Sequence, residues 1–225
     1  MNQIKTSALI MGASGLVGRE LVKILSQQKK YKRIHLLVRK SVEIPDTACE
    51  QHIIDFNQLT HYSELFQVTD VYCCLGTTIK KAKTKEAFRK VDFEYPIEAA
   101  KLAVAAGVEK FLIITSMGAN PESTFFYNRV KGEVEESLTK FGLKSLHIFR
   151  PSLLLGERGE FRIGERIAAK ASGVLGTFMK GPLRPYKAIQ ARTVAAAMST
   201  IASFGKNGVH TYPSQEIEQL AKEKG

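Results

Sequence analysis

The sequence lacks any apolar run of about 20 residues, which a membrane-spanning helix would require. Its amino terminus also lacks a basic segment followed by a long apolar run and a cleavage site, so we expect no signal peptide. Internal repeats and low-complexity linkers are absent too. With 225 residues, 44% of them hydrophobic, the chain is long enough for one sizeable core. We therefore predict a single domain over residues 1–225.

Cysteine is scarce, and its spacing excludes a cysteine-based metal site. The three cysteines are Cys49, Cys73 and Cys74, an odd number without metal-ligand spacing. The adjacent pair lies inside an apolar segment, as buried thiols of a reducing compartment do. We predict a cytoplasmic protein without a metal.

The positive charge of the chain lacks the pattern of a nucleic-acid-binding protein. The formal net charge is +11, but apart from KKAKTKEAFRK at 80–90 the basic residues are spread along the chain. No basic motif interleaved with aromatic residues is present, which argues against nucleic-acid binding. A polyanionic cofactor or an acidic protein partner would account for part of the charge.

A glycine motif follows the first apolar segment. Residues 5–11, KTSALIM, have the composition of a buried parallel strand, and RELVKILSQQ after the glycines has helical periodicity. Gly12 permits a tight turn, Gly15 lets the backbone approach a pyrophosphate, and Gly18 lets the helix pack close to the sheet. The phosphates would rest on amide groups at the helix start. The predicted dinucleotide-binding residues of this turn are Gly12, Ser14, Gly15, Leu16, Val17 and Gly18.

The second predicted strand, at 33–39, ends in a basic cluster. Arg39 is followed by Lys40 and Ser41, and no Asp or Glu stands at this strand end. An NAD site usually has an acidic residue here for the ribose 2′-hydroxyl, whereas a basic residue accommodates a 2′-phosphate. Arg39, with help from Arg19 or Ser14, predicts NADP(H) as the cofactor. The alternative is that Arg39 is a solvated strand-end charge.

Two further strand ends carry candidate cofactor contacts. The strand EQHIIDF ends in Asp55 and Phe56, where an adenine would lie. Asp55 either accepts a hydrogen bond from the adenine amino group or caps the following turn. The strand DVYCCLGTT ends in a glycine and two threonines, which either contact the cofactor ribose and phosphate or form an ordinary turn. The predicted contacts there are Leu75, Gly76, Thr77 and Thr78.

A serine, a tyrosine and a lysine form the candidate catalytic group. The apolar run FLIIT at 111–115 predicts a buried strand that delivers Ser116 at its carboxyl end. If a helix begins near Phe125, Tyr127 and Lys131 project from one face at i and i+4. The ammonium of Lys131 would favour the phenolate of Tyr127, whose ordinary pKa is about 10, and Ser116 would hold a substrate oxygen. The alternative is a solvated helix beside a strand-end serine.

The order of the predicted elements indicates the fold class. Strands alternate with helices, including a helix at 88–107 and a sixth strand at 144–150, which predicts an α/β, Rossmann-type doubly wound parallel sheet with helices on both faces. Ligands of such sheets bind beyond the carboxyl ends of the strands, where the candidate residues fall. In the carboxyl third we predict that residues 161–180 form a helix leading into a glycine-punctuated loop. Another helix, a short strand and a final helix would follow. Residues 155–190 would form a small cap over the substrate side of the cleft.

The blocks GASGLVG, CCLGTT, ITSMGA, FYNRVKGEVE and FRPSLLLG resemble the atypical short-chain dehydrogenase/reductases. More narrowly, the chain is similar to the Tat-interacting-protein branch of that superfamily. The resemblance implies a Rossmann-type fold that binds NADPH, with Tyr127 as general acid/base and Ser116 orienting the substrate carbonyl. Lys131 would lower the tyrosine pKa and contact the nicotinamide ribose. The stretch expected to lie against the carboxamide is Pro151, Ser152 and Leu153.

One departure from the family concerns proton relay. Many short-chain dehydrogenases have an asparagine on the helix before the catalytic strand, and the nearest candidate in this chain is Asp92. We predict an NADP(H)-dependent oxidoreductase of a small carbonyl or alcohol substrate, active as a monomer or homodimer. The alternative is a non-catalytic NADPH sensor that acts through a protein partner. A sugar-nucleotide epimerase or dehydratase usually needs a larger carboxyl-terminal domain than 225 residues allow.

Overall fold

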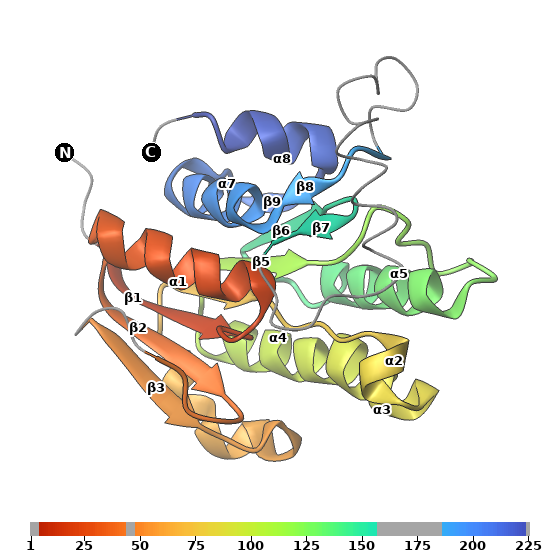
Figure 1. Ribbon diagram of the computed structural model, residues 1–225. Coiled ribbons are helices and arrows are strands. Elements are labelled where there is room, and N and C mark those ends of the chain that lie inside the picture. Colours follow the sequence, from red (N-terminus) through yellow and green to blue (C-terminus); the bar gives the residue numbers. More distant parts are fainter. Residues whose placement is uncertain (1–4, 44–47, 157–185, 224–225) are drawn as a thin grey trace.

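The computed structural model describes residues 5–43, 48–156 and 186–223. Its main sheet has seven parallel strands in the order β3-β2-β1-β4-β5-β6-β9 (Figure 1). The strand order reverses between β1 and β4, the switch point of a doubly wound sheet. The strands are β1 (Lys5–Met11), β2 (Tyr31–Val38), β3 (Cys49–Ile53), β4 (Asp70–Cys73), β5 (Lys110–Ile114), β6 (Ser145–Arg150) and β9 (Gly208–Pro213).

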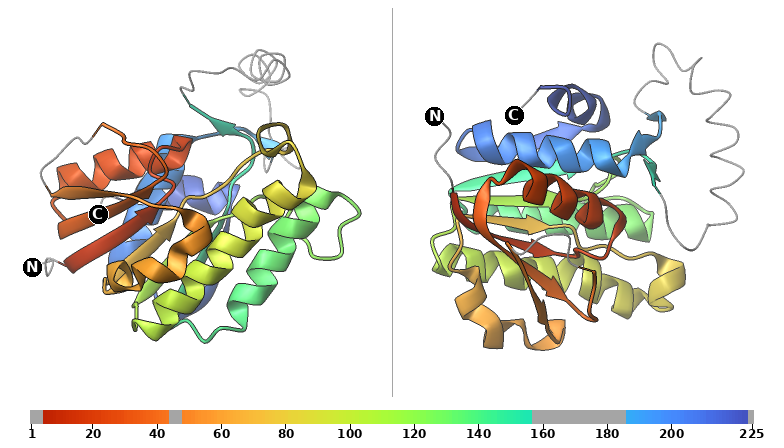
Figure 2. Two further views of the ribbon diagram at one scale, coloured as in Figure 1. Left: turned by 90° about the horizontal axis from the view of Figure 1, so that it is seen from below. Right: turned by 60° about the vertical axis from the view of Figure 1, so that its left-hand side comes forward.

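Helices cover both faces of this sheet, as the sequence predicts (Figures 1 and 2). One face carries α1 (Leu16–Gln28) and α7 (Ala191–Phe204), with α8 (Ser214–Leu220) against α7. The other carries α4 (Tyr95–Ala105), α5 (Phe126–Thr139) and the 3₁₀ segment η1 (Phe56–Phe66). The remaining elements are α2 (Ile79–Ala82), α3 (Lys85–Arg89), the π-helical η2 (Lys90–Glu94), and a two-stranded sheet of β7 (Leu154–Leu155) and β8 (Ile189–Gln190).

Strand alternation divides the core into two clusters. On β1, Ala8 and Ile10 pack with the residues of α1 and α7, whereas Leu9 and Met11 pack with those of α4 and α5. The whole of β4 is buried, as expected for a parallel strand covered on both faces. The register pairs Met11 with Cys73, and Cys73 with Ile113, so these strands end at one level. The segments that follow them consequently meet at one edge of the sheet.

The helix predicted over 88–107 is interrupted by one π-helical turn. The amide of Tyr95 donates to the carbonyl of Lys90, an i→i+5 bond, and both residues keep helical dihedral angles. Pro96 follows in the first turn of α4. Because proline has no amide hydrogen, the carbonyl four residues before it loses its usual partner, and the π turn accommodates this loss.

The described part of the carboxyl third adds a strand to the main sheet. Strand β9 pairs with β6 from Ser145↔Gly208 to Arg150↔Pro213 and shields an otherwise open sheet edge. The helix and loop predicted within 161–180, and most of the predicted cap at 155–190, lie outside the described residues. Among the residues that the structure describes, no helix is both long and apolar enough to span a membrane.

Candidate functional site

A cavity of about 870 Å³ lies at the carboxyl ends of the central strands, beside the switch point. Segments that follow β1, β2, β4, β5 and β6 line it together with α5. Of the predicted site residues, Gly18 and Asp55 do not line this cavity. Those that do are Gly12, Ser14, Gly15, Leu16, Val17, Arg39, Phe56, Leu75, Gly76, Thr77, Thr78, Ser116, Tyr127, Lys131, Pro151, Ser152 and Leu153.

The glycine turn between β1 and α1 packs too closely for larger residues. Gly12 has φ of +82°, and a Cβ there would lie 2.6 Å from the carbonyl oxygen of Cys74. A Cβ on Gly18 would lie 2.1 Å from the carbonyl oxygen of Gly12. Helix α1 therefore begins directly over the end of β1, and its first turn contains no acidic residue. Its first amides and its dipole suit an anion in the cavity.

Besides Lys131, three cationic side chains of the described residues line the same cavity. Arg39 follows β2, Arg19 comes from α1, and Lys81 comes from α2. Lys81 is exposed, and it lies in a short helix whose start is capped by Thr78, because Thr78 Oγ1 accepts the amide of Lys81 at 3.1 Å. Lys81 is consequently a cavity residue that sequence reasoning misses.

Asp55 caps the segment that follows β3. Its Oδ1 accepts the backbone amide of Asn57 at 2.9 Å and the side-chain amide of Asn57 at 2.7 Å. Of the two alternatives for Asp55, the structure shows the cap. The cavity wall nearby consists of Phe56 and Tyr95, whose ring centroids are 5.5 Å apart. Burial and then Asp55 raise the pKa of Tyr95, partly offset by Arg39. Tyr95 is a second cavity residue without a local sequence signal.

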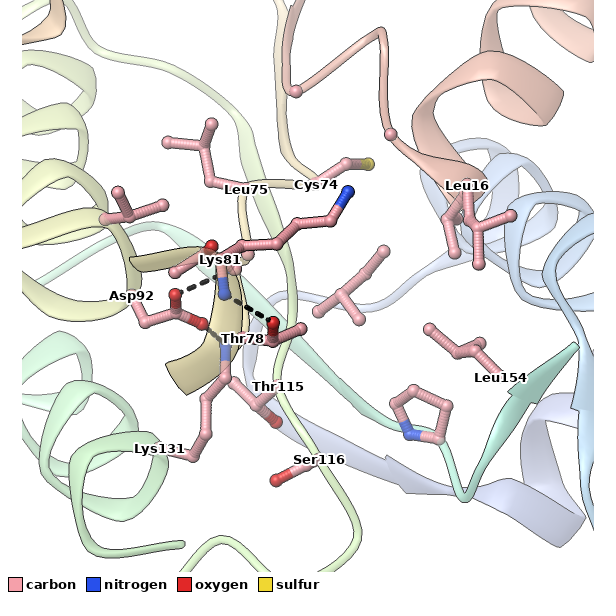
Figure 3. A pocket seen from close by; sticks show the side chains of 18 of the residues that line it. Leu16, Cys74, Leu75, Thr78, Lys81, Asp92, Thr115, Ser116, Lys131 and Leu154 are labelled. Atoms are coloured by element: carbon pink, nitrogen blue, oxygen red, sulfur yellow. Dashed lines mark hydrogen bonds and ion pairs between the residues drawn. The ribbon is translucent and has the colours of Figure 1, made fainter. Parts of the chain in front are cut away.

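Asp92 connects the turn after β4 to the candidate catalytic lysine. Its carboxylate is almost fully buried; Oδ2 accepts the amide of Thr77 at 2.8 Å, and Oδ1 lies 2.8 Å from Lys131 Nζ (Figure 3). Burial lowers the pKa of Lys131, but Asp92, followed by Tyr127, raises it, and the net pKa lies above its ordinary value. Lys131 is therefore a buried cation that is already paired with a carboxylate.

Ser116 and Tyr127 complete this group. The Ser116 side chain projects into the cavity from the segment after β5 (Figure 3). Its Oγ is buried, and among the described residues it has no hydrogen-bond partner. Tyr127 lies in the first turn of α5, 38% exposed, one turn before Lys131. The structure thus brings Ser116, Tyr127 and Lys131 to one cavity. An unpartnered buried hydroxyl is a group that a ligand oxygen can satisfy.

Buried polar bonds and close packing hold α5 in place. Glu135 accepts Thr115 Oγ1 at 2.5 Å and the Nε of Arg150 at 3.0 and 3.1 Å, which joins α5 to the ends of β5 and β6. A Cβ on Gly132 would lie 2.1 Å from the backbone nitrogen of Pro121, so the helix touches the preceding loop. These contacts fix the part of α5 that carries Tyr127 and Lys131.

The stretch Pro151–Leu153 lines the cavity but uses several of its backbone groups internally. The carbonyl of Pro151 accepts the amide of Met117 at 3.0 Å, and the amide of Ser152 donates to Ser214 Oγ at 3.0 Å. The carbonyl of Leu153 accepts the amide of Ile189 at 2.9 Å. These bonds shape the cavity wall, and they leave the Ser152 amide committed within the protein.

Comparisons with known proteins agree with this architecture. The HIM1 family model matches residues 27–180. Protein HTATIP2 of Rattus norvegicus is 34% identical over 222 residues, covering 96% of this chain and 90% of that protein. Protein FMP52, mitochondrial, of Candida albicans is 34% identical over 209 residues, covering 90% of each. These relatives confirm the resemblance to the Tat-interacting-protein branch.

A solved structure confirms the Rossmann-type fold. The Bordetella bronchiseptica enzyme WbmH, in complex with NAD+, superposes with a TM-score of 0.71. The two sequences are 13% identical, and the match covers 96% of this chain and 79% of that chain.

The names of the fungal relatives correct one prediction. FMP52 of Candida albicans and of two other yeasts is a mitochondrial protein by name. The prediction of a cytoplasmic protein is therefore wrong as it stands. The prediction of a cytoplasmic location depended on buried cysteines and on a missing secretory signal. Neither feature distinguishes one reducing compartment from another.

Proposed function

This chain belongs to the HIM1 family, and from that premise we propose that it is an NADP(H)-dependent oxidoreductase of the atypical short-chain dehydrogenase/reductase type. Its substrate would be a small carbonyl or alcohol compound. The observation that carries the proposal is the buried hydroxyl of Ser116, which has no hydrogen-bond partner among the described residues and lines the same cavity as Tyr127 and Lys131.

The cavity residues fit a nicotinamide dinucleotide phosphate. The amides at the start of α1 would hold the pyrophosphate, and Arg39 would pair with the 2′-phosphate. Phe56 and Tyr95 offer an aromatic wall on the same side as Arg39. NADP(H), when bound, supplies or accepts the hydride.

The protein's own residues would manage the substrate oxygen and its proton. Ser116 would donate a hydrogen bond to the carbonyl oxygen, and the Tyr127 hydroxyl would deliver the proton that turns this oxygen into an alcohol. The Lys131 ammonium, kept charged by its raised pKa, would stabilise the resulting phenolate. Because Tyr127 is 38% exposed, solvent can return the proton. Asp92 would fix the position of the ammonium through their ion pair.

The test combines binding and turnover in one sample. NADPH fluorescence titration measures cofactor binding, and a panel of small aldehydes and ketones is then followed at the NADPH absorbance. We expect Tyr127→Phe to abolish turnover while it leaves NADPH affinity nearly unchanged, since the ring remains. Tyr62→Phe on η1, outside the cavity lining, is the matched control and should behave as the wild type.

The outcomes separate the candidate functions. Turnover that survives in Tyr127→Phe contradicts the general-acid role. Tight NADPH binding without turnover across the panel favours the alternative of a non-catalytic NADPH sensor with a protein partner. Failure to bind NADPH would overturn both functions.

A further inference from the structure

Three side chains with metal-binding atoms converge on the outer part of the sheet, away from the cavity. His35 lies on β2, and Glu50 and His52 lie on the edge strand β3. The parallel register pairs His35 with Glu50 and Leu37 with His52. Because side chains alternate along a strand, His35, Glu50 and His52 share the face that also carries Leu37. The sheet itself therefore places these side chains together.

The ligand atoms are close enough for one ion. His35 Nδ1 and His52 Nε2 are 2.9 Å apart, and Glu50 oxygens lie 3.8 Å from the first and 3.9 Å from the second. Two imidazole nitrogens on one zinc ion, each about 2.0–2.1 Å from the metal, are roughly 3.0–3.4 Å apart. The histidine pair needs to open by only a few tenths of an ångström. The carboxylate needs to approach by about half an ångström, a small rotation for a surface side chain.

Burial favours a built site over three solvated groups. The side chains of His35 and His52 are 13% and 20% exposed, whereas that of Glu50 is 53% exposed. Two largely buried imidazoles that face each other nitrogen to nitrogen can share only one hydrogen. A cation between them would satisfy both nitrogens, with Glu50 as the third ligand and water at an open position. Nitrogen and carboxylate ligands of this kind suit zinc and its neighbours in the first transition row.

We propose that His35, Glu50 and His52 bind a divalent transition-metal ion of the zinc class. The ion ties the edge strand β3 to β2, its only strand neighbour in the described sheet. None of the three ligands lines the cavity, so the site is structural and independent of the proposed oxidoreductase activity. The sequence prediction of no metal considered cysteine spacing, which carries no information about histidines on two paired strands.

Arg33 competes with the metal for Glu50. Its Nε lies 4.0 Å from Glu50 Oε2, and both side chains are mostly exposed. Removal of this charge should therefore strengthen metal binding. An exposed ion pair of this kind corresponds to about a twofold to fivefold change in affinity.

The experiment uses the full chain without an affinity tag, after treatment with EDTA. Isothermal titration with zinc chloride should show one ion per chain, and the melting temperature should rise with added zinc. The absorption spectrum of the cobalt-substituted protein reports the coordination geometry. We expect His52→Ala to weaken zinc binding by at least about 100-fold, and Glu50→Gln to weaken it less, because water can replace an exposed carboxylate. Arg33→Gln should bind more tightly.

His210→Ala is the matched control, because His210 lies on β9 at the opposite edge of the sheet. It should retain the wild-type affinity. The proposal is overturned if the wild type does not bind zinc, or if His52→Ala and His210→Ala bind it equally. Circular dichroism checks the fold of each variant. If His52→Ala does not fold, the other two variants decide the test. The proposal is then overturned if Glu50→Gln and Arg33→Gln both bind zinc with the wild-type affinity.

Discussion

Asp92 is the nearest candidate for the relay asparagine of many short-chain dehydrogenases, and its charge shapes the surroundings of Lys131. A neutral amide would leave the ammonium charge to act on its other neighbours. The carboxylate instead pairs with Nζ at 2.8 Å and also accepts the amide of Thr77. Both partners are buried, so neither charge is well screened by water. Asp92 therefore holds both the turn after β4 and the ammonium of Lys131 in place.

Asp92→Asn should lower both the stability of the fold and the pKa of Lys131. An unpaired buried ammonium destabilises the fold by about 3 kcal/mol, reduced where the asparagine oxygen still accepts a hydrogen bond. The pKa of Lys131 should fall, because Asp92 is the largest contribution that raises it. Urea unfolding at pH 7 measures the first effect. Asp55→Asn is the control, since Asp55 is exposed and asparagine also caps well. Equal stabilities of the two variants would contradict the role of the pair.

The predicted preference for NADP(H) over NAD(H) depends on Arg39. Its guanidinium would form charge-assisted hydrogen bonds with a 2′-phosphate that NADH lacks, bonds worth about 1.5–3 kcal/mol. Arg39→Ala should therefore weaken NADPH binding by about 10- to 100-fold and leave NADH binding nearly unchanged. Fluorescence titration of wild type and variant with NADPH and with NADH measures both affinities. The NADH titration is the control, because NADH lacks the 2′-phosphate. A similar loss for both would remove the 2′-phosphate role and leave Arg39 as a solvated charge.

Local spacing explains which site residues can be read from the sequence. Glycines three apart predict a turn, and residues four apart predict one helix face, so Gly12 and the Tyr127–Lys131 pair are visible without a structure. Tyr95 reaches the cavity through packing between distant segments, and Lys81 reaches it from a short helix capped by Thr78. No pattern that marks a cofactor contact distinguishes either residue in the sequence. Asp55 shows the converse, because its cap is local but so common that it could not exclude a ligand role.

Helix α5 shows how an element sets the position of site residues. It is held by the buried Glu135 network and by contact at Gly132 with the loop before it. The helix itself is predictable from its periodicity, but its distance from the loop is not. A glycine in a helix lowers stability relative to alanine unless packing requires it, and the close contact at Gly132 is such a requirement.

Gly132→Ala should destabilise the protein in spite of the better helix propensity of alanine. A Cβ only 2.1 Å from the Pro121 nitrogen must displace the loop or the helix, and overpacking of this kind costs about 1–3 kcal/mol. Displacement of α5 should also weaken NADPH turnover if Tyr127 acts as proposed. Urea unfolding and the turnover assay measure the two effects. Ser137→Ala, farther along the same helix, should change stability by less than about 0.5 kcal/mol. If Gly132→Ala raises the free energy of unfolding, the loop at Pro121 can move to accommodate the Cβ without loss of stability.

At the scale of the whole molecule, the doubly wound sheet follows from alternating apolar strands and helices, and the structure confirms it. The place of β9 could not be predicted in the same way. A short strand such as GVHTYP can pair at either sheet edge. Its pairing with β6 goes with long-range contacts of α7 with α1 and β6, and of α8 with β6. Sequence patterns thus specify the elements and the switch point, whereas long-range packing decides how the sheet is completed.

The far end of the sheet from the cavity contains a buried polar cluster. Tyr31 OH donates to Asp70 Oδ2 at 2.5 Å and lies 2.7 Å from Tyr72 OH. Burial is the largest cause that raises the pKa of Tyr31 and of Tyr72 well above the ordinary value. Burial also raises the pKa of Tyr212 to about 12, and that of the Cys73 thiol to about 12. In the folded protein these groups keep their protons well above pH 10.

Stability should therefore fall in alkaline solution. In the unfolded chain, cysteine loses its proton near pH 8.5 and tyrosine near pH 10, so above those values the folded state binds more protons. The free energy of unfolding then decreases as pH rises, by about 1.4 kcal/mol per pH unit for each retained proton, until the folded groups titrate. Urea midpoints between pH 8 and 11.5 measure the slope. Tyr72→Phe should make it shallower above pH 10, whereas Tyr186→Phe, at a 61% exposed position, should not. Equal slopes in the wild type and Tyr72→Phe would mean that the buried tyrosines ionise without unfolding.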